Sequence, residues 1–158
     1  MNNILILGAS GYIGARLSYL LAKDGNNVTA LCFSSIPKDK KWCSLMKEVV
    51  VGDITSDNVI DKITNQSFDV AIHLVSLDHN DSNKAPTFVN SVNVMPVWNL
   101  LESFKTKKTL KRFIYFSTIH VYGKIPYKVI KESHNTCPSS TYGLTHLLAE
   151  NICNMYNA

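Results

Sequence analysis

A short apolar run that leads directly into three evenly spaced glycines constrains the fold of this chain more than any other feature. Ile4 to Leu7 form a continuous apolar stretch, which is the pattern of a strand buried in a parallel sheet. Gly8, Gly11 and Gly14 follow with the spacing G-x-x-G-x-x-G. In that order, the first glycine can take a tight turn, the second can let the backbone approach a phosphate, and the third can let a helix pack closely on the strand.

The residues after the glycines predict a helix whose start faces a ligand. Apolar residues recur at helical spacing at Ile13, Leu17, Leu20 and Leu21. Gly25 is expected to cap this helix. The free N–H groups and the positive dipole end at its start suit phosphate, so the motif, with Tyr12 and Ile13 inside it, predicts dinucleotide binding. A glycine-rich turn without a ligand is the open alternative.

Composition excludes several classes of function. The 158 residues are 46% apolar and 18% charged, which predicts one soluble domain spanning residues 1–158. The net charge of +4 comes almost wholly from lysine, and no arginine-rich stripe points to nucleic acid. No apolar run approaches the length of a membrane span, so we expect a cytoplasmic protein that does not bind membranes.

Cysteine and histidine spacing predicts no metal site. The four cysteines form no C-x-x-C pair, and the five histidines lack the i, i+4 pairing of a metal-binding helix. Reduced thiols are therefore expected at Cys32, Cys43, Cys137 and Cys153.

Further along the chain, strand and helix patterns alternate. Strands are expected at 27–33, 49–51, 68–74 and 112–118, and helices at 55–64, 87–107 and 139–156. Residues 37–47 suggest a loop with a short helix, 78–86 suggest a polar loop, and Pro96 should kink the long helix. This alternation predicts an α/β fold, a doubly wound parallel sheet of order 3-2-1-4-5 with a ligand crevice where strands 1 and 4 diverge.

The end of the second strand leaves the choice between NAD and NADP open. An acid often stands there to bind the ribose hydroxyls, but Cys32 occupies the position. Ser34, Ser35 and Lys38 could serve a 2′-phosphate, and a plain loop explains them equally well.

Six landmarks in order and spacing give a more specific resemblance. They are the glycine motif, Gly52-Asp53-Ile54, His73-Leu74-Val75-Ser76, Asn93-Val94, Ser117-Thr118-Ile119-His120-Val121-Tyr122-Gly123, and Tyr142 within Ser140-Thr141-Tyr142-Gly143. The whole chain resembles the N-terminal, Rossmann part of the extended short-chain dehydrogenases/reductases, the NAD-dependent epimerase/dehydratase family. The pair Ile119-His120 is not the Asp-Glu pair of many dehydratases, which leans away from dehydration.

The resemblance implies a set of cofactor contacts. Asp53 and Ile54 would meet the adenine, although Asp53 could instead cap the following turn. A turn would lie along the nicotinamide-side ribose and pyrophosphate, and it consists of Leu74, Val75 and Ser76. Asn93 matches a buried asparagine of the long helix that is usually structural.

The resemblance also implies hydride transfer on a nucleotide sugar. Tyr142 would take a hydroxyl proton while Thr118 holds the same oxygen. The family's lysine, four residues after the tyrosine, is replaced by His146, which is shorter and mostly neutral near pH 7. No lysine compensates nearby in sequence, since Lys124, Lys128 and Lys131 lie in the preceding loop. His146 could also be an ordinary surface histidine.

Length is the second departure, because the chain stops just after the helix that carries Tyr142. The part that holds the sugar nucleotide in the family is expected to be absent, leaving the fifth strand as a sheet edge unless something covers it. Three functions stay open: an epimerase/dehydratase-like enzyme impaired as an isolated chain, a catalytically silent dinucleotide-binding module, and an NADP-binding redox sensor. Expected partners are a nucleotide sugar, a second copy, or a complementing C-terminal chain.

Overall fold

The computed structural model of this protein describes residues 1–124 and 129–157, so Lys128 lies outside the described residues. The chain forms two compact units, one of Met1–Val75 with Asn99–Phe116 and one of Ser76–Trp98 with Ser117–Ala158. The elements, in chain order, are β1 (Asn3–Leu7), α1 (Tyr12–Lys23), β2 (Asn27–Cys32), α2 (Lys40–Leu45), β3 (Glu48–Val51), α3 (Asp57–Thr64), β4 (Phe68–His73), α4 (His79–Lys84), α5 (Pro86–Asn93), α6 (Met95–Lys107), β5 (Leu110–Tyr115), the 3-10 helix η1 (Ile119–Tyr122) and α7 (Thr141–Tyr156).

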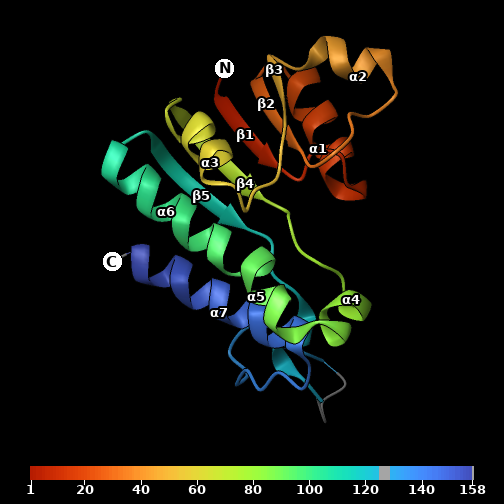
Figure 1. Ribbon diagram of the computed structural model, residues 1–158, viewed down its shortest axis with the longest axis vertical. Helices are drawn as coiled ribbons and strands as arrows, with labels where there is room; N and C mark the ends of the chain where they lie inside the picture. The colour runs from red at the N-terminus through yellow and green to blue at the C-terminus, as the bar shows by residue number, and fades with distance from the viewer. Residues whose placement is uncertain (125–128, 158) are drawn as a thin grey trace. The chain divides into compact units, whose positions relative to one another are not determined.

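The first unit is built on a parallel sheet, labelled in Figure 1, with the strand order β3-β2-β1-β4-β5. Every pairing is parallel, and Leu5 of β1 lies between Thr29 of β2 and Ala71 of β4. The predicted doubly wound order 3-2-1-4-5 is therefore confirmed. The order reverses between β1 and β4, which is where ligands bind in open α/β sheets.

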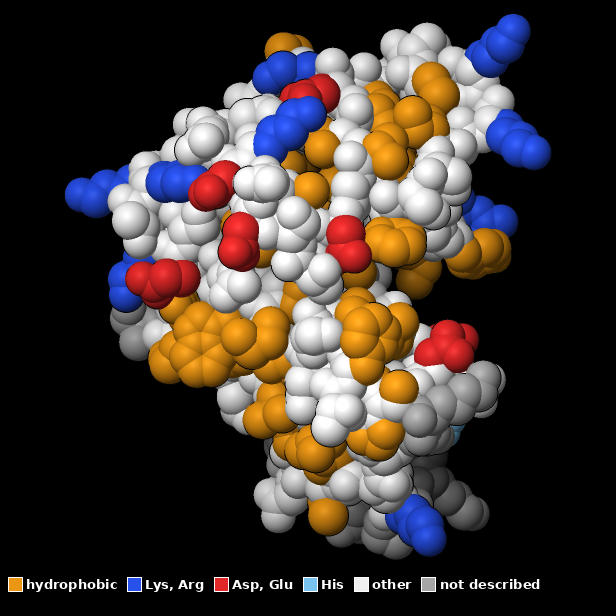
Figure 2. All heavy atoms as spheres, in the orientation of Figure 1, with side chains coloured by type: hydrophobic (Ala, Val, Ile, Leu, Met, Phe, Trp, Pro, Cys, Tyr) orange, Lys and Arg blue, Asp and Glu red, His pale blue; other side chains and the backbone are white. Residues whose placement is uncertain are grey.

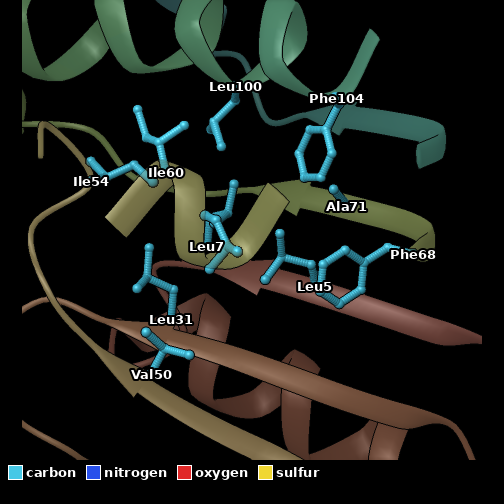
Figure 3. Packing of buried hydrophobic residues seen from close by; sticks show 11 residues of the cluster. Leu5, Leu7, Leu31, Val50, Ile54, Ile60, Phe68, Ala71, Leu100 and Phe104 are labelled. Atoms are coloured by element: carbon cyan, nitrogen blue, oxygen red, sulfur yellow. The ribbon is translucent and has the colours of Figure 1, made fainter. Parts of the chain in front are cut away.

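Alternation along β1 explains why the sheet is covered on both faces. Leu5 and Leu7 point into a cluster with Leu100 and Phe104 of α6 and with residues of α3, as Figure 3 shows. Ile4 and Ile6 belong to a second cluster that α1 and α2 complete. Because successive side chains of a strand point to opposite faces, a run of four apolar residues needs helices on both sides.

Helix α1 packs through only some of the residues that its apolar spacing predicts, because Leu17 and Leu21 lie against the second cluster but Ile13 and Leu20 do not. Ile13 and Leu20 are 53% and 54% exposed, whereas Gly14 and Ser18 are buried. Small side chains let the helix lie close to its neighbours, and Trp42 of α2 seals the contact by donating its Nε1–H to Ser18 Oγ at 2.8 Å. The helix ends as expected, with Gly25 at φ +86° directly after the C-cap.

The predicted long helix over 87–107 is wrong in one respect, because the chain breaks into α5 and α6 at Val94. Pro96 has no N–H to donate to Val92 and its ring crowds that carbonyl, so the turn before it opens instead of merely kinking. The predicted polar loop at 78–86 contains α4. Asp78 Oδ1 accepts the Asp81 N–H at 2.9 Å and so starts that helix.

Two other boundaries differ from the sequence prediction. Strand β5 runs from Leu110 to Tyr115 and not to Thr118, because Thr118 caps η1. Helix α7 begins at Thr141, with Ser140 as its cap. Strand β5 is an outer strand of the sheet, and Ile114 on it is 37% exposed.

Within residues 1–124 and 129–157, no helix is both long and apolar enough to cross a membrane. On the face shown in Figure 2, lysine and arginine side chains are scattered and not gathered into one patch. All four cysteines are free thiols, as predicted.

Candidate dinucleotide and catalytic site

The turn at residues 8–14, which we call the glycine turn, is shaped by close backbone contacts. Gly8 has φ +88°, a conformation that favours glycine, and a Cβ there would lie 3.2 Å from a methyl group of Val75. A Cβ on Gly14 would lie only 2.2 Å from the Gly8 carbonyl oxygen. Gly8 and Gly14 are therefore required by the turn itself, independently of any ligand.

The start of α1 is open. Gly11 is its N-cap and supplies no side chain, no acid stands in the first turn, and Tyr12 is 78% exposed. The first N–H groups of a helix have no partner within it, and those of α1 carry the positive end of the dipole with no side-chain cap. Arg16 lies one turn further, with its guanidinium carbon 3.8 Å from the centre of the Tyr12 ring. This arrangement suits a pyrophosphate.

Three of the expected cofactor contacts lie at or just after the ends of β2 and β3. Cys32 is fully buried, and burial raises the pKa of its thiol. Asp53 is exposed, and its Oδ1 accepts the Thr55 N–H at 2.9 Å, which is the capping role considered above. Ile54 is 4% exposed and packs in the core. The structure thus leaves Asp53 accessible to a ligand and gives Ile54 a core position.

Leu74 and Val75 follow β4 in the same unit. The Leu74 N–H donates to the Leu7 carbonyl at 3.0 Å, which holds this segment beside the glycine turn. Both side chains are half-buried, and Val75 is the residue that approaches Gly8. Ser76 is exposed and belongs to the second unit.

In the second unit, Asn93 is a structural tie. Its Oδ1 accepts the Leu77 N–H at 2.7 Å, and its Nδ2 donates to Thr145 Oγ1 at 3.2 Å. Thr145 in turn donates to the Tyr142 carbonyl at 3.0 Å. Asn93 is completely buried, so it fixes α5 against the first turns of α7.

Helix α7 and η1 are locked together where the predicted catalytic residues stand. Ser140 Oγ accepts the Gly143 N–H at 3.2 Å and caps α7. A Cβ on Gly143 would lie 2.4 Å from the His120 carbonyl oxygen, so only glycine lets η1 approach this closely. Thr118 caps η1, and its Oγ1 accepts the His120 N–H at 3.3 Å.

Tyr142 sits among three histidines, in what we call the ring cluster. Its ring centre lies 4.4 Å from that of His146, 5.5 Å from His120 and 6.0 Å from His79, all edge to face. His79 and His120 stack on each other at 5.1 Å. The sequence patterns gave neither His120 nor His79 a catalytic role. His120 stands two residues after Thr118, a usable signal, but nothing in the sequence links His79 to α7.

His146 is 2% exposed, so it is not a surface histidine. Burial and, second, the charge of His120 lower the pKa of His146 to about 4. The imidazole is therefore neutral at pH 7. Lys124 and Lys131 of the preceding loop are exposed. Among the residues that the structure describes, no three His, Cys, Asp or Glu side chains are grouped so as to hold a metal ion.

Each unit thus gathers its own part of the predicted site. The first unit holds the expected cofactor contacts Gly8, Gly11, Tyr12, Ile13, Gly14, Cys32, Asp53, Ile54, Leu74 and Val75. The second holds Ser76, Asn93, Thr118, Tyr142 and His146.

The chain is similar in sequence to curated proteins that are described as UDP-glucose 4-epimerases. The UDP-glucose 4-epimerase of Halalkalibacterium halodurans is 30% identical over 149 residues, which are 93% of this chain and 44% of that protein. A putative UDP-glucose 4-epimerase of Methanocaldococcus jannaschii is 27% identical over 98% of this chain and 50% of its own. The chain therefore spans about half the length of these curated relatives.

Solved structures agree in fold. The UDP-glucuronic acid 4-epimerase from Bacillus cereus, in complex with UDP-glucuronic acid and NAD, superposes with a TM-score of 0.82 at 29% identity, covering 98% of this chain and 52% of that one. The family described as the NAD dependent epimerase/dehydratase family matches residues 4–158. This chain belongs to the NAD dependent epimerase/dehydratase family.

Proposed function

We propose that this chain is the dinucleotide-binding and proton-transferring part of an enzyme that acts on a nucleotide sugar by hydride transfer with NAD or NADP. The observation that carries the proposal is the start of α1, where Gly11 provides no side-chain cap to the first N–H groups. The matched relatives are about twice as long, so we assign the sugar-nucleotide site largely to a companion part.

The residues of the first unit fit a dinucleotide. A Cβ on Gly14 would collide with the Gly8 carbonyl, so the turn keeps its tight shape, and the helix start stays free of acidic side chains. Backbone N–H groups and a helix dipole are suited to a pyrophosphate. Without an acid at Cys32, a 2′-phosphate meets no repulsion there, which leaves NAD and NADP both acceptable.

The residues of the second unit suit proton transfer. Tyr142 is half-buried at the start of α7 and would take the proton of a sugar hydroxyl, and Thr118 would hold the same oxygen through its Oγ1. When bound, the dinucleotide supplies the hydride acceptor. A phenol ionises near pH 10, so Tyr142 needs help to act as a base at neutral pH.

His146 does not provide the positive charge that would favour the phenolate. A full charge about 4 Å away at an effective dielectric constant of about 20 is worth roughly 4 kcal/mol, which is an upper figure for what a neutral imidazole forgoes. Because His146 is buried and its pKa is lowered to about 4, it is neutral at pH 7. We therefore expect slow turnover.

The neutral imidazole of His146 also favours a second candidate function, a catalytically silent dinucleotide-binding module. This candidate keeps the open start of α1 and needs neither Tyr142 nor a charge at position 146. Hydride transfer decides between the two. A chain that binds NAD, yet forms no reduced cofactor from UDP-glucose or UDP-glucuronic acid when its companion part is supplied, is the silent module.

Binding itself is tested at Gly11, with a matched pair of variants. Asp and Asn both cap helices well, and the φ of −73° at Gly11 suits either. Both variants add the same Cβ, 3.3 Å from the Gly8 carbonyl oxygen, so this contact cancels in the comparison. Gly11→Asp adds a negative charge where a pyrophosphate would lie, so titration calorimetry with NAD and NADP should show affinity at least about tenfold weaker than for Gly11→Asn.

The control is thermal unfolding of both variants, which should match because both cap α1. Equal cofactor affinity for the two variants would contradict a pyrophosphate at the start of α1. Failure of the unaltered chain to bind either dinucleotide at millimolar concentration would overturn both candidate functions.

A further inference from the structure

The end of β2 decides how a dinucleotide fold treats the ribose of the adenosine half. An acidic side chain there accepts hydrogen bonds from the ribose hydroxyls and would repel a 2′-phosphate, whereas a nearby arginine accommodates that phosphate. Cys32 ends β2, and burial raises the pKa of its thiol, so this side chain is uncharged at pH 7. Residues 33–38, which follow it, include no acid. The end of β2 therefore offers a 2′-phosphate no repulsion.

The glycine turn is tied to this same strand end. The N–H groups of Gly8 and Ala9 both donate to the Leu31 carbonyl, at 3.1 Å and 2.8 Å. Leu31 directly precedes Cys32, so these two bonds hold the start of α1 beside the end of β2. One dinucleotide can therefore place its pyrophosphate at the helix start and its adenosine ribose at the strand end.

Arg16, in the second turn of α1, has its guanidinium held by an aromatic ring. The guanidinium carbon lies 3.8 Å from the centre of the ring of Tyr12, the first residue of α1. A ring covers the face of a guanidinium and leaves the N–H groups, which point outward in its plane, for an anion. The Arg16 side chain is exposed, and none of the ion pairs among the described residues involves it. Arg16 is therefore directed toward the start of α1, with its donors accessible to a phosphate.

A hollow of about 380 Å³ joins Arg16 to the segment that follows β2. Its lining includes Ala15 and Arg16 of α1 together with Pro37 and Asp39, which lead into α2. All of these residues belong to the first unit. Because Pro37 is only five positions beyond Cys32, the hollow brings Arg16 beside the chain that leaves the ribose end of β2.

The charges around this hollow favour an anion. Asp39 is the acid in its lining, and the Asp39 Oδ1 accepts the Lys41 N–H at 2.8 Å, which caps α2. The side chains of Lys38, Lys40 and Lys41 next to it in sequence are all exposed. Together with Arg16, they set four positive charges against one negative charge. The resulting field attracts a phosphate group and disfavours a cation.

We propose that this chain prefers NADP to NAD because Arg16 binds the 2′-phosphate of NADP, assisted by Lys38. Ser34 and Ser35, exposed just after β2, supply hydroxyl donors to the same phosphate. The proposal rests on the proposed function and adds the choice of dinucleotide. A guanidinium fork and a phosphate form two parallel N–H···O bonds, which a ribose hydroxyl cannot match. Arg16 determines cofactor specificity and takes no part in hydride transfer.

The first test compares the two dinucleotides by titration calorimetry on the full 158-residue chain. NADP should bind at least about tenfold more tightly than NAD. Arg16→Gln should weaken NADP binding about tenfold and leave NAD binding within about twofold. Arg16→Lys keeps the charge but lacks the planar fork, so it should lose only about threefold. Arg112→Gln, which makes the same change of charge on the outer strand β5, is the matched control and should alter neither affinity.

The outcomes separate this proposal from the proposed function. Equal affinities for NADP and NAD in the unaltered chain would overturn the preference and leave the function standing. A preference that survives in Arg16→Gln would overturn the role of Arg16. If neither dinucleotide binds at millimolar concentration, the proposed function fails and the preference fails with it. Thermal unfolding of the Arg16 variants should match that of the unaltered chain, because the side chain is exposed.

The second test locates the 2′-phosphate directly. The chain contains only two arginines, Arg16 and Arg112, so their side-chain Nε–Hε signals give a simple NMR spectrum, which Arg112→Gln assigns. Adenosine 2′,5′-bisphosphate should shift the Arg16 signal, whereas adenosine 5′-monophosphate, which lacks only the 2′-phosphate, should not. The Arg112 signal should stay in place with both ligands. Equal shifts of Arg16 by the two ligands, or no shift with the bisphosphate, would overturn the contact between Arg16 and the 2′-phosphate.

Discussion

The starts of α1 and α7 share a glycine at the third helical residue and differ in the residue that caps the helix. Each helix has glycine as its third residue, and in each a Cβ there would lie within 2.4 Å of a carbonyl oxygen, of Gly8 in one case and His120 in the other. The caps differ, because Gly11 offers α1 no side chain whereas Ser140 closes α7 on the Gly143 N–H.

This difference indicates what each unit presents to a ligand. An uncapped helix leaves N–H groups and a dipole free, so the first unit offers backbone. In the capped helix α7, the Gly143 N–H already donates to Ser140 Oγ. The second unit therefore offers a ligand side chains, those of Tyr142 and its neighbours. A backbone site is read easily from glycine spacing, while a side-chain site depends on which residues the fold brings together.

The shared glycines should give the largest effects. Gly14→Ala and Gly143→Ala each force a methyl group against a carbonyl, so we expect each to lower the free energy of unfolding by about 3 kcal/mol or more. Urea unfolding measures this. Gly25→Ala, which has open space around its Cβ but φ +86°, is the control and should cost about 1 kcal/mol. Equal losses at Gly14 and Gly25 would show that backbone conformation, and not contact, sets the cost.

Burial of His146 should make stability depend on pH. The pKa of His146 is about 4 in the folded chain against 6.5 for the free side chain, so the unfolded chain takes up this proton first as the pH falls. The contribution is intact above about pH 6.5 and is lost progressively toward pH 4, up to about 3 kcal/mol.

Urea unfolding of the unaltered chain and of His146→Gln between pH 7 and pH 4 measures that loss, because carboxylates contribute equally to both. The difference between the two proteins should change across this window. A constant difference would mean that His146 is hydrated in the folded chain.

Substitutions at the two helix caps should change the free energy of unfolding least, and they should affect α7 more than α1. Ser140→Ala removes the side-chain oxygen that accepts the Gly143 N–H, so it should lower the free energy of unfolding by about 1 kcal/mol. Gly11→Ser should change it by only a few tenths of a kcal/mol, because glycine is already a fair cap and the added Cβ would lie 3.3 Å from the Gly8 carbonyl oxygen. Thermal unfolding of both variants measures the contrast. A destabilised Gly11→Ser would indicate that the start of α1 is more crowded than its exposure suggests.

Much of the first unit could be predicted from sequence because its signals are local. The buried run of β1, the glycine turn and the order of strands follow from periodicity and from the handedness of βαβ connections. Apolar spacing predicted only part of the face of α1, since Leu17 and Leu21 pack against the core. Leu20 is exposed, and Gly14 and Ser18 are buried and allow close approach. The sequence predicted a kink at Pro96, but not that the helix would end before it at Val94. The sequence also did not predict α4, because its residues are polar and show no apolar periodicity.

The sequence by itself determined the fold class, the glycine turn and the presence of His146 where the family has lysine, because these features depend on residue type and spacing. Only the tertiary structure decided that His146 is buried and neutral and that His79 and His120 gather around Tyr142. Burial and contacts between distant segments depend on how α4, η1 and α7 pack, and no local pattern records that packing.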